Sequence, residues 1–309
     1  MKNLLTLFLL IALNFKGQCC MNEYHALLDG ELVYSEAYLV SPTPKGRFSN
    51  VSKEELARLL DRAYKIYNSS RDMTYYSDYA VMLTYNGRFR EANTIFLKIE
   101  KETPNHYPTA ANLGTTYELL GEIDSAIYWL NRAIKIKPDA HRGSEWIHLK
   151  ILEAKKAAKD DAQKLWHTDI LKLNLGENDI PENKERVNLD SIRNQIYTQL
   201  TERMSFIHPK DPIVGRLLFD LGNVTAITQN VKGAIQIYEE ASKYGFESDL
   251  MAKRDKRFKW LQWKADIRTD TESLVKENVG LILILMLLIP IALIFLFVKN
   301  RLKRMNRSI

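Results

Sequence analysis

The residues best suited to chemistry lie in the middle of the chain: His141, Glu145 and His148. The two histidines are seven positions apart, which places them on one face of a helix with the carboxylate between them. Imidazole and carboxylate are common metal ligands, so this cluster is a candidate metal site. The spacing is not that of an HExxH zinc motif, however. The interpretation that the sequence favours is a surface or packing role for both histidines.

The sequence contains no nucleophile elbow, no P-loop and no dinucleotide-binding fingerprint. Its two cysteines, Cys19 and Cys20, are adjacent and precede the body of the chain, so the body has neither a disulfide framework nor a cysteine-based metal site. We therefore predict a protein that is not an enzyme and that needs no cofactor and no metal. An unrecognised hydrolase, with His148 and Glu145 as the first residues to test, is the outlying alternative.

Charge is distributed unevenly along the 309 residues. The formal net charge is +6, and five cations without an acidic residue lie at 299–309. The basic character therefore belongs mostly to a tail, and basic residues do not alternate with aromatic ones as in a single-strand binding site. We predict neither a nucleic-acid partner nor a small-molecule substrate.

Both ends of the chain carry signals that direct it to a membrane. Residues 1–20 combine Lys2 with an apolar run at 4–13, which is typical of a secretory signal peptide and too short to span a bilayer. Cys19 or Cys20 is a candidate for lipidation, although the residues before them lack the usual Leu-small-small pattern. Plain cleavage of the signal peptide is the alternative.

Residues 279–298 carry no charge and, at about 1.5 Å per residue, match the thickness of a bilayer core. The basic residues at 299–309 follow directly, and such clusters mark the cytoplasmic side. The sequence therefore predicts one transmembrane helix at 279–298 in a bacterial inner membrane. The body would be periplasmic, and 299–309 would form a basic cytoplasmic tail.

Residues 107–140 have the most regular pattern in the body. Small and large apolar residues recur at spacings of three and four in two stretches, separated by Gly121 and ended by Pro138. These positions are Ala110, Leu113, Gly114 and Tyr117, then Ala126, Leu130 and Ala133. The 34-residue unit resembles a tetratricopeptide repeat, a helix pair that buries its apolar face only against neighbouring pairs. The resemblance implies an all-α solenoid of helix-turn-helix units.

Other segments repeat this pattern or flank it. Residues 73–106 match it at a shift of 34, with Gly87, Ala92, Phe96 and Pro104 in register, and residues 215–248 match it less regularly. Residues 141–214 are predicted to form a degenerate repeat, whose first helix starts at His141, and a helical connector with its cap at Asp190.

The remaining predicted segments flank the repeats. They are an N-terminal arm at 21–51 that leans on the first helix, a capping helix at 52–72 begun by Ser52, and a charged stalk helix at 249–278. For this last helix, which carries Trp260 and Trp263, contact with lipid headgroups is the alternative to a solvated stalk.

By the resemblance, the first helices of the repeats line a concave groove that binds a peptide or a partner helix. The positions carried over are Thr74, Ser77, Val81, Thr84, Pro108, Ala111, Thr115, Glu118, Arg142, Glu145, Leu149 and Leu152. A lysine–asparagine clamp, which some members use for peptide carboxylates, is not supported at Ser77 and Val81, whereas Asn112 and Arg142 are compatible with it. We predict the binding groove where the regular helix meets the irregular one, at Ala111, Asn112, Thr115, Glu118, Arg142, Glu145, Trp146 and Leu149.

The stretches HRGSEWIHLKILEAK and LLFDLGN also resemble tetratricopeptide proteins of the Bacteroidota envelope, which implies a location and a fold but no activity. We predict a non-catalytic, membrane-anchored scaffold that binds a protein or peptide on the extracytoplasmic side. The alternative is an accessory subunit of an envelope assembly or transport complex that acts through its transmembrane helix.

Overall fold

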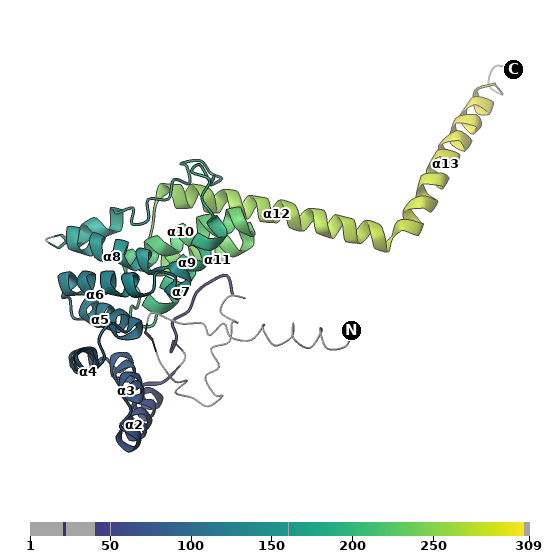
Figure 1. Ribbon diagram of the computed structural model, residues 1–309. Helices are drawn as coiled ribbons and strands as arrows, with labels where there is room; N and C mark the ends of the chain where they lie inside the picture. Colours follow the sequence, from purple (N-terminus) through teal and green to yellow (C-terminus); the bar gives the residue numbers. More distant parts are fainter. Residues whose placement is uncertain (1–20, 23–40, 50, 160, 306–309) are drawn as a thin grey trace, which may run out of the picture. The chain divides into compact units, whose positions relative to one another are not determined.

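The computed structural model describes residues 21–22, 41–49, 51–159 and 161–305 (Figure 1). Every regular element in these ranges is a helix, which agrees with the all-α prediction. The chain divides into a unit that ends at Arg257 and a second unit that begins at Phe258. The predicted signal peptide at 1–20 and most of the predicted arm lie outside the described residues.

Helices α2 to α6 form the regular, repeat-like part of the first unit (Figure 1). Their bounds are α2 Lys53–Ser70, α3 Met73–Tyr85, α4 Phe89–Glu102, α5 Tyr107–Leu119 and α6 Ile123–Ile136. Ser52 caps α2 as predicted, because its side chain accepts a hydrogen bond from the Glu55 N–H. The turns inside the two pairs use Gly87 and Gly121 with φ of 75° and 80°, a conformation that favours glycine.

The third pair departs from the pattern. His141 and Arg142 adopt left-handed backbone angles inside the short α7 Ala140–Gly143, so the long helix α8 spans Glu145–Ala157 instead of starting at His141. The expected second helix is replaced by the 3-10 helix η2 Ala162–His167 and a long irregular segment. Helix α9 Leu189–Arg203 then packs against α7, α8 and the following helix. Its cap is Asn188, whose side chain accepts from the Ser191 N–H, and not Asp190.

Helices α10 Pro212–Thr228 and α11 Val231–Lys243 restore the paired arrangement. Asp211 caps α10 with Pro212 in the first helical turn, and Gly245 follows α11 with a φ of 88°. Helix α12 then runs over Asp249–Glu277 and α13 over Val279–Met305.

The predicted membrane anchor is not upheld. Within the ranges given above, no helix is long and apolar enough to cross a membrane. This finding contradicts the prediction of a transmembrane helix at 279–298. It also contradicts the single-pass inner-membrane localisation that depended on that helix.

Equivalent glycines on α5 and α10 give a matched test of the packing. A Cβ on Gly222 would lie 2.5 Å from Cε1 of Tyr238, whereas a Cβ on Gly114 would meet its nearest atom, the Leu130 N, at 3.5 Å. Tyr238 is buried and its hydroxyl donates to Asn223, so its ring has little room to move. We expect Gly222→Ala to lower the free energy of unfolding by about 1–3 kcal/mol.

For Gly114→Ala we expect no loss, and a gain of up to about 1 kcal/mol from the better helix propensity of alanine. Urea denaturation of the two full-length variants, followed by circular dichroism, measures both effects. Equal losses at the two positions would contradict this account of the close approach at Gly222.

Candidate functional site

The side chain of Asn112 on α5 binds the main chain of Asn22. The Asn22 N–H donates to Oδ1 of Asn112 at 2.8 Å, and Nδ2 of Asn112 donates to the Asn22 carbonyl at 3.1 Å. Both residues and Met21 are buried. One amide side chain therefore satisfies the donor and the acceptor of a single backbone residue, 90 positions away in the sequence.

Residues 41–49 hold this segment from the other side. Nη1 of Arg47 donates to the Met21 carbonyl at 3.2 Å and to the Tyr85 hydroxyl at 3.2 Å. The Arg47 N–H donates to the Ser205 hydroxyl just after α9. A Cβ on Gly46 would lie 2.2 Å from the Met204 carbonyl oxygen, so only glycine fits there. The arm, which the sequence predicted to lean on the first helix, therefore also reaches the end of α9.

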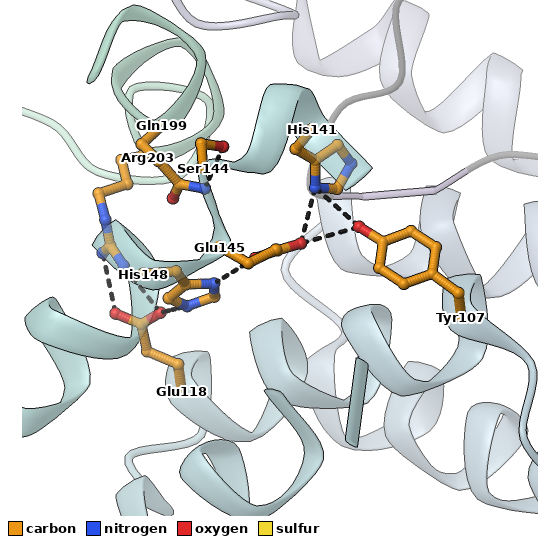
Figure 2. A network of polar contacts seen from close by, with 8 residues as sticks. All are labelled: Tyr107, Glu118, His141, Ser144, Glu145, His148, Gln199 and Arg203. Atoms are coloured by element: carbon orange, nitrogen blue, oxygen red, sulfur yellow. Dashed lines mark hydrogen bonds and ion pairs between the residues drawn. The ribbon is translucent and has the colours of Figure 1, made fainter. Parts of the chain in front are cut away.

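A buried carboxylate, Glu118 on α5, collects several cations beside this face (Figure 2). Arg203 of α9 donates from Nη1 at 2.9 Å and from Nη2 at 3.1 Å. His148 of α8 contacts it through Nε2 at 2.6 Å, and Lys155 donates to it at 2.6 Å. Three helices are thereby joined at one side chain.

A second buried carboxylate, Glu145, continues the network on the far side of His148 (Figure 2). The Tyr107 hydroxyl donates to Oε1 of Glu145 at 2.8 Å, and Nδ1 of His141 lies 2.7 Å from the same oxygen. Nδ1 of His148 lies 3.7 Å from Oε2. The left-handed turn at His141 allows its ring to face Glu145 from the preceding short helix.

Burial and charge pairing shift the pKa values of the residues in this network in opposite directions. Burial raises the pKa of Glu118, but Arg203, Lys155 and His148 more than offset that effect and hold the pKa well below its usual range. Burial also raises the pKa of Glu145, and His141 and His148 reverse the shift. For His148, burial lowers the pKa, yet the facing Glu118 and Glu145 raise it overall. The contacts within the network therefore favour the charged forms of Glu118, Glu145 and His148.

These shifts predict a maximum of stability in weakly acidic solution. The lowered pKa values of Glu118 and Glu145 give stabilisation above about pH 4.5 that is lost as the pH falls. The raised pKa of His148 gives stabilisation that is complete below about pH 6.5 and is lost as the pH rises through the folded-state value. We expect the free energy of unfolding of the full chain to peak between these limits.

Urea denaturation at a series of pH values measures the profile. His148→Gln should flatten its alkaline side, whereas His208→Gln, at an exposed position, should leave the profile unchanged. An alkaline slope that survives His148→Gln would assign the pH dependence to another group.

The predicted groove residues do not share one open surface. Ala111, Asn112, Thr115, Glu118 and Glu145 are all buried. Arg142 is exposed, and its carbonyl accepts from Gln195 of α9. Nε1 of Trp146 donates to the same glutamine, and Leu149 packs with Ala126, Leu130 and Leu152. The later start of α8 changes which side chains face α5.

Several members of the site were not predicted as groove residues. His148, Lys155, Gln199 and Arg203 meet Glu118 or its neighbours only because α8 and α9 converge on α5. The one sequence signal was the cluster of His141, Glu145 and His148, for which the packing interpretation was favoured. Within the described residues, no group of three His, Cys, Asp or Glu side chains is placed to hold a metal ion.

A small pocket opens beside Glu118, between α5, α8 and the end of α9. Its empty volume is about 400 Å³ including the open mouth, and it is lined by Thr115, Glu118, Leu119, His148, Lys155, Gln199, Glu202, Arg203, Phe206 and Ile207. Glu118 and Glu202 are buried, whereas Phe206 and Ile207 are partly exposed. The first unit thus offers two features that can bind a ligand: the amide of Asn112 and this pocket.

Comparison with known proteins gives no relative, since no family model, no curated protein and no solved structure matches the chain.

Proposed function

We propose that this chain is a non-catalytic helical-repeat scaffold of the tetratricopeptide type, which binds an extended segment of a protein partner along the face of α5. The observation that carries the proposal is the pair of hydrogen bonds between the Asn112 side chain and the Asn22 main chain. These hydrogen bonds involve only the main-chain N–H and carbonyl of Asn22 and not its side chain. The main chain of a partner segment can therefore form the same two bonds.

The arm is bound to the same face, so a partner segment competes with it. The arm has the advantage of being tethered, which gives it a high effective concentration. A binding test therefore needs a chain in which the arm is weakened. Asn22→Pro removes the N–H that donates to Asn112, at a residue that lies outside the helices.

The test uses a labelled synthetic peptide with the sequence of residues 17–25, in which serine replaces both cysteines, and full-length Asn22→Pro protein. Fluorescence anisotropy should show saturable binding, weakened about ten-fold or more by adding Asn112→Ala, because both main-chain bonds are lost. Asn112→Asp, which keeps the acceptor and loses the donor, should lie between the two.

Asn131→Ala on α6 is the matched control, since the amide of Asn131 donates within its own helix to the Ile127 carbonyl. Circular dichroism verifies that each variant is folded. Absence of saturable binding, or binding that does not depend on Asn112, would overturn the proposed function.

A further inference from the structure

Glu202 is a buried carboxylate that has no hydrogen-bond partner in the described part of the chain. It lies on α9, is 4% exposed, and neither of its carboxylate oxygens has a hydrogen-bond partner among the described residues. Burial without a hydrogen bond is unfavourable for a carboxylate, because the group loses its hydration and no protein donor replaces the lost water. Glu202 also lines the pocket beside Glu118, which opens to solvent at its mouth.

The cationic side chains that line the pocket all pair with Glu118. Lys155 donates to Oε1 of Glu118 at 2.6 Å, and Arg203 donates to both oxygens of the same carboxylate. His148 contacts Glu118 at 2.6 Å as well. Since these three side chains converge on one carboxylate, no cation of the described residues pairs with the second carboxylate in the pocket, Glu202.

The other walls of the pocket indicate the shape of the missing group. Thr115 lines the same pocket, and its buried hydroxyl also has no hydrogen-bond partner within the ranges that the structure describes. Phe206 and Ile207 are partly exposed and apolar. A ligand that fits has several N–H donors at its tip and an apolar stem. A guanidinium group meets this description, because it has five donors, pairs with a carboxylate through two of them and carries three methylene groups in arginine.

We propose that the pocket formed by Glu202, Thr115, Phe206 and Ile207 binds the side chain of an arginine from the protein partner. This inference rests on the proposed function and adds to it the chemistry of one residue in the partner. The guanidinium pairs with Glu202, the Thr115 hydroxyl accepts a further N–H, and the methylene groups pack on Phe206 and Ile207.

N-acetyl-L-arginine amide tests the pocket separately from the main-chain site. Titration into the full-length protein, followed by isothermal calorimetry, should show saturable binding. N-acetyl-L-citrulline amide has the same shape without the charge and should bind about ten-fold more weakly or worse. Glu202→Gln should remove the preference for arginine, whereas Glu153→Gln, at an exposed position on α8, should keep it.

A thermal unfolding measurement without ligand guards against a misfolded variant. If Glu202 is unpaired in the free protein, Glu202→Gln should melt at the same temperature as the parent or higher. A strongly lowered melting temperature would show that Glu202 has a partner within the chain, and the inference would fail. It would fail equally if arginine and citrulline amides bind alike or if neither binds.

The two proposals are separable by their outcomes. Binding of the peptide without binding of the arginine amide would leave the scaffold function and remove the arginine pocket. Binding of the arginine amide with failure of the peptide would retain a cation site and remove the main-chain site at Asn112.

Discussion

Replacing Glu118 with alanine is expected to lower the free energy of unfolding by about 3–5 kcal/mol, because it leaves buried cations without their counter-charge. Arg203 is buried and makes two hydrogen bonds to this carboxylate, and His148 and Lys155 lose the same partner. The effect spreads over α5, α8 and α9, so it should also reduce the cooperativity with which these helices unfold. Urea denaturation of the full-length variant, followed by circular dichroism, measures the loss.

Glu153→Ala is the matched control. Glu153 pairs with Lys150 on the same exposed face of α8, and such surface pairs contribute less than about 1 kcal/mol. Glu118→Gln separates charge from shape, since it retains the size of the side chain and should still lose most of the stabilisation. A loss below about 1 kcal/mol for Glu118→Ala would mean that water or a shifted lysine replaces the carboxylate.

Replacing Arg254 with methionine is the second large change, with an expected loss of about 3 kcal/mol from carbonyl groups left without donors. Arg254 lies on α12, is 1% exposed and donates to the carbonyls of Leu175, Gly176 and Asn178 at 3.1, 2.6 and 2.9 Å. It also donates to Oδ1 of Asn223 at 2.7 Å. This side chain therefore fixes the long segment between η2 and α9 to the α10–α11 pair.

Hydrogen–deuterium exchange distinguishes this role from a general loss of stability. In Arg254→Met, amides at 173–178 should exchange faster at denaturant concentrations where α3 to α6 remain protected. Lys256→Met, two positions away and exposed, provides the control for the loss of a cation on α12. Unchanged protection of 173–178 would assign the anchoring of this segment to other contacts.

Local patterns in the sequence predicted most of the helices. The 34-residue shift between 73–106 and 107–140, with glycines at the turns, corresponds to the pairs α3–α4 and α5–α6. Ser52 and Asp211 act as caps at the predicted helix starts. Periodicity and capping involve residues within about one or two helical turns, so a sequence reports them directly.

Predictions that depended on extending a pattern were less successful. The helix expected from His141 begins later because two residues there adopt left-handed angles, which the apolar spacing of the stretch does not reveal. Within the described residues the 3-10 helix η2 and an irregular segment stand in place of the helix expected after it, and α9 packs against α7, α8 and α10. The predicted groove positions were counted along regularly repeated helices. From His141 onward the helices no longer follow that repeat, so the positions counted there do not correspond to one helix face.

By itself, the sequence determined the all-α class, the helix pairs and their turns, and the cluster of His141, Glu145 and His148, because each depends on residues close together in the chain. Only the tertiary structure decided the candidate site. Glu118 and Arg203 are 85 positions apart, and Asn112 and Asn22 are 90 apart. Arg203 reaches Glu118 because α9 lies beside α5, and Asn22 reaches Asn112 because the N-terminal segment lies on α5. No local spacing encodes which of these side chains become partners, or that Glu202 has none among the described residues.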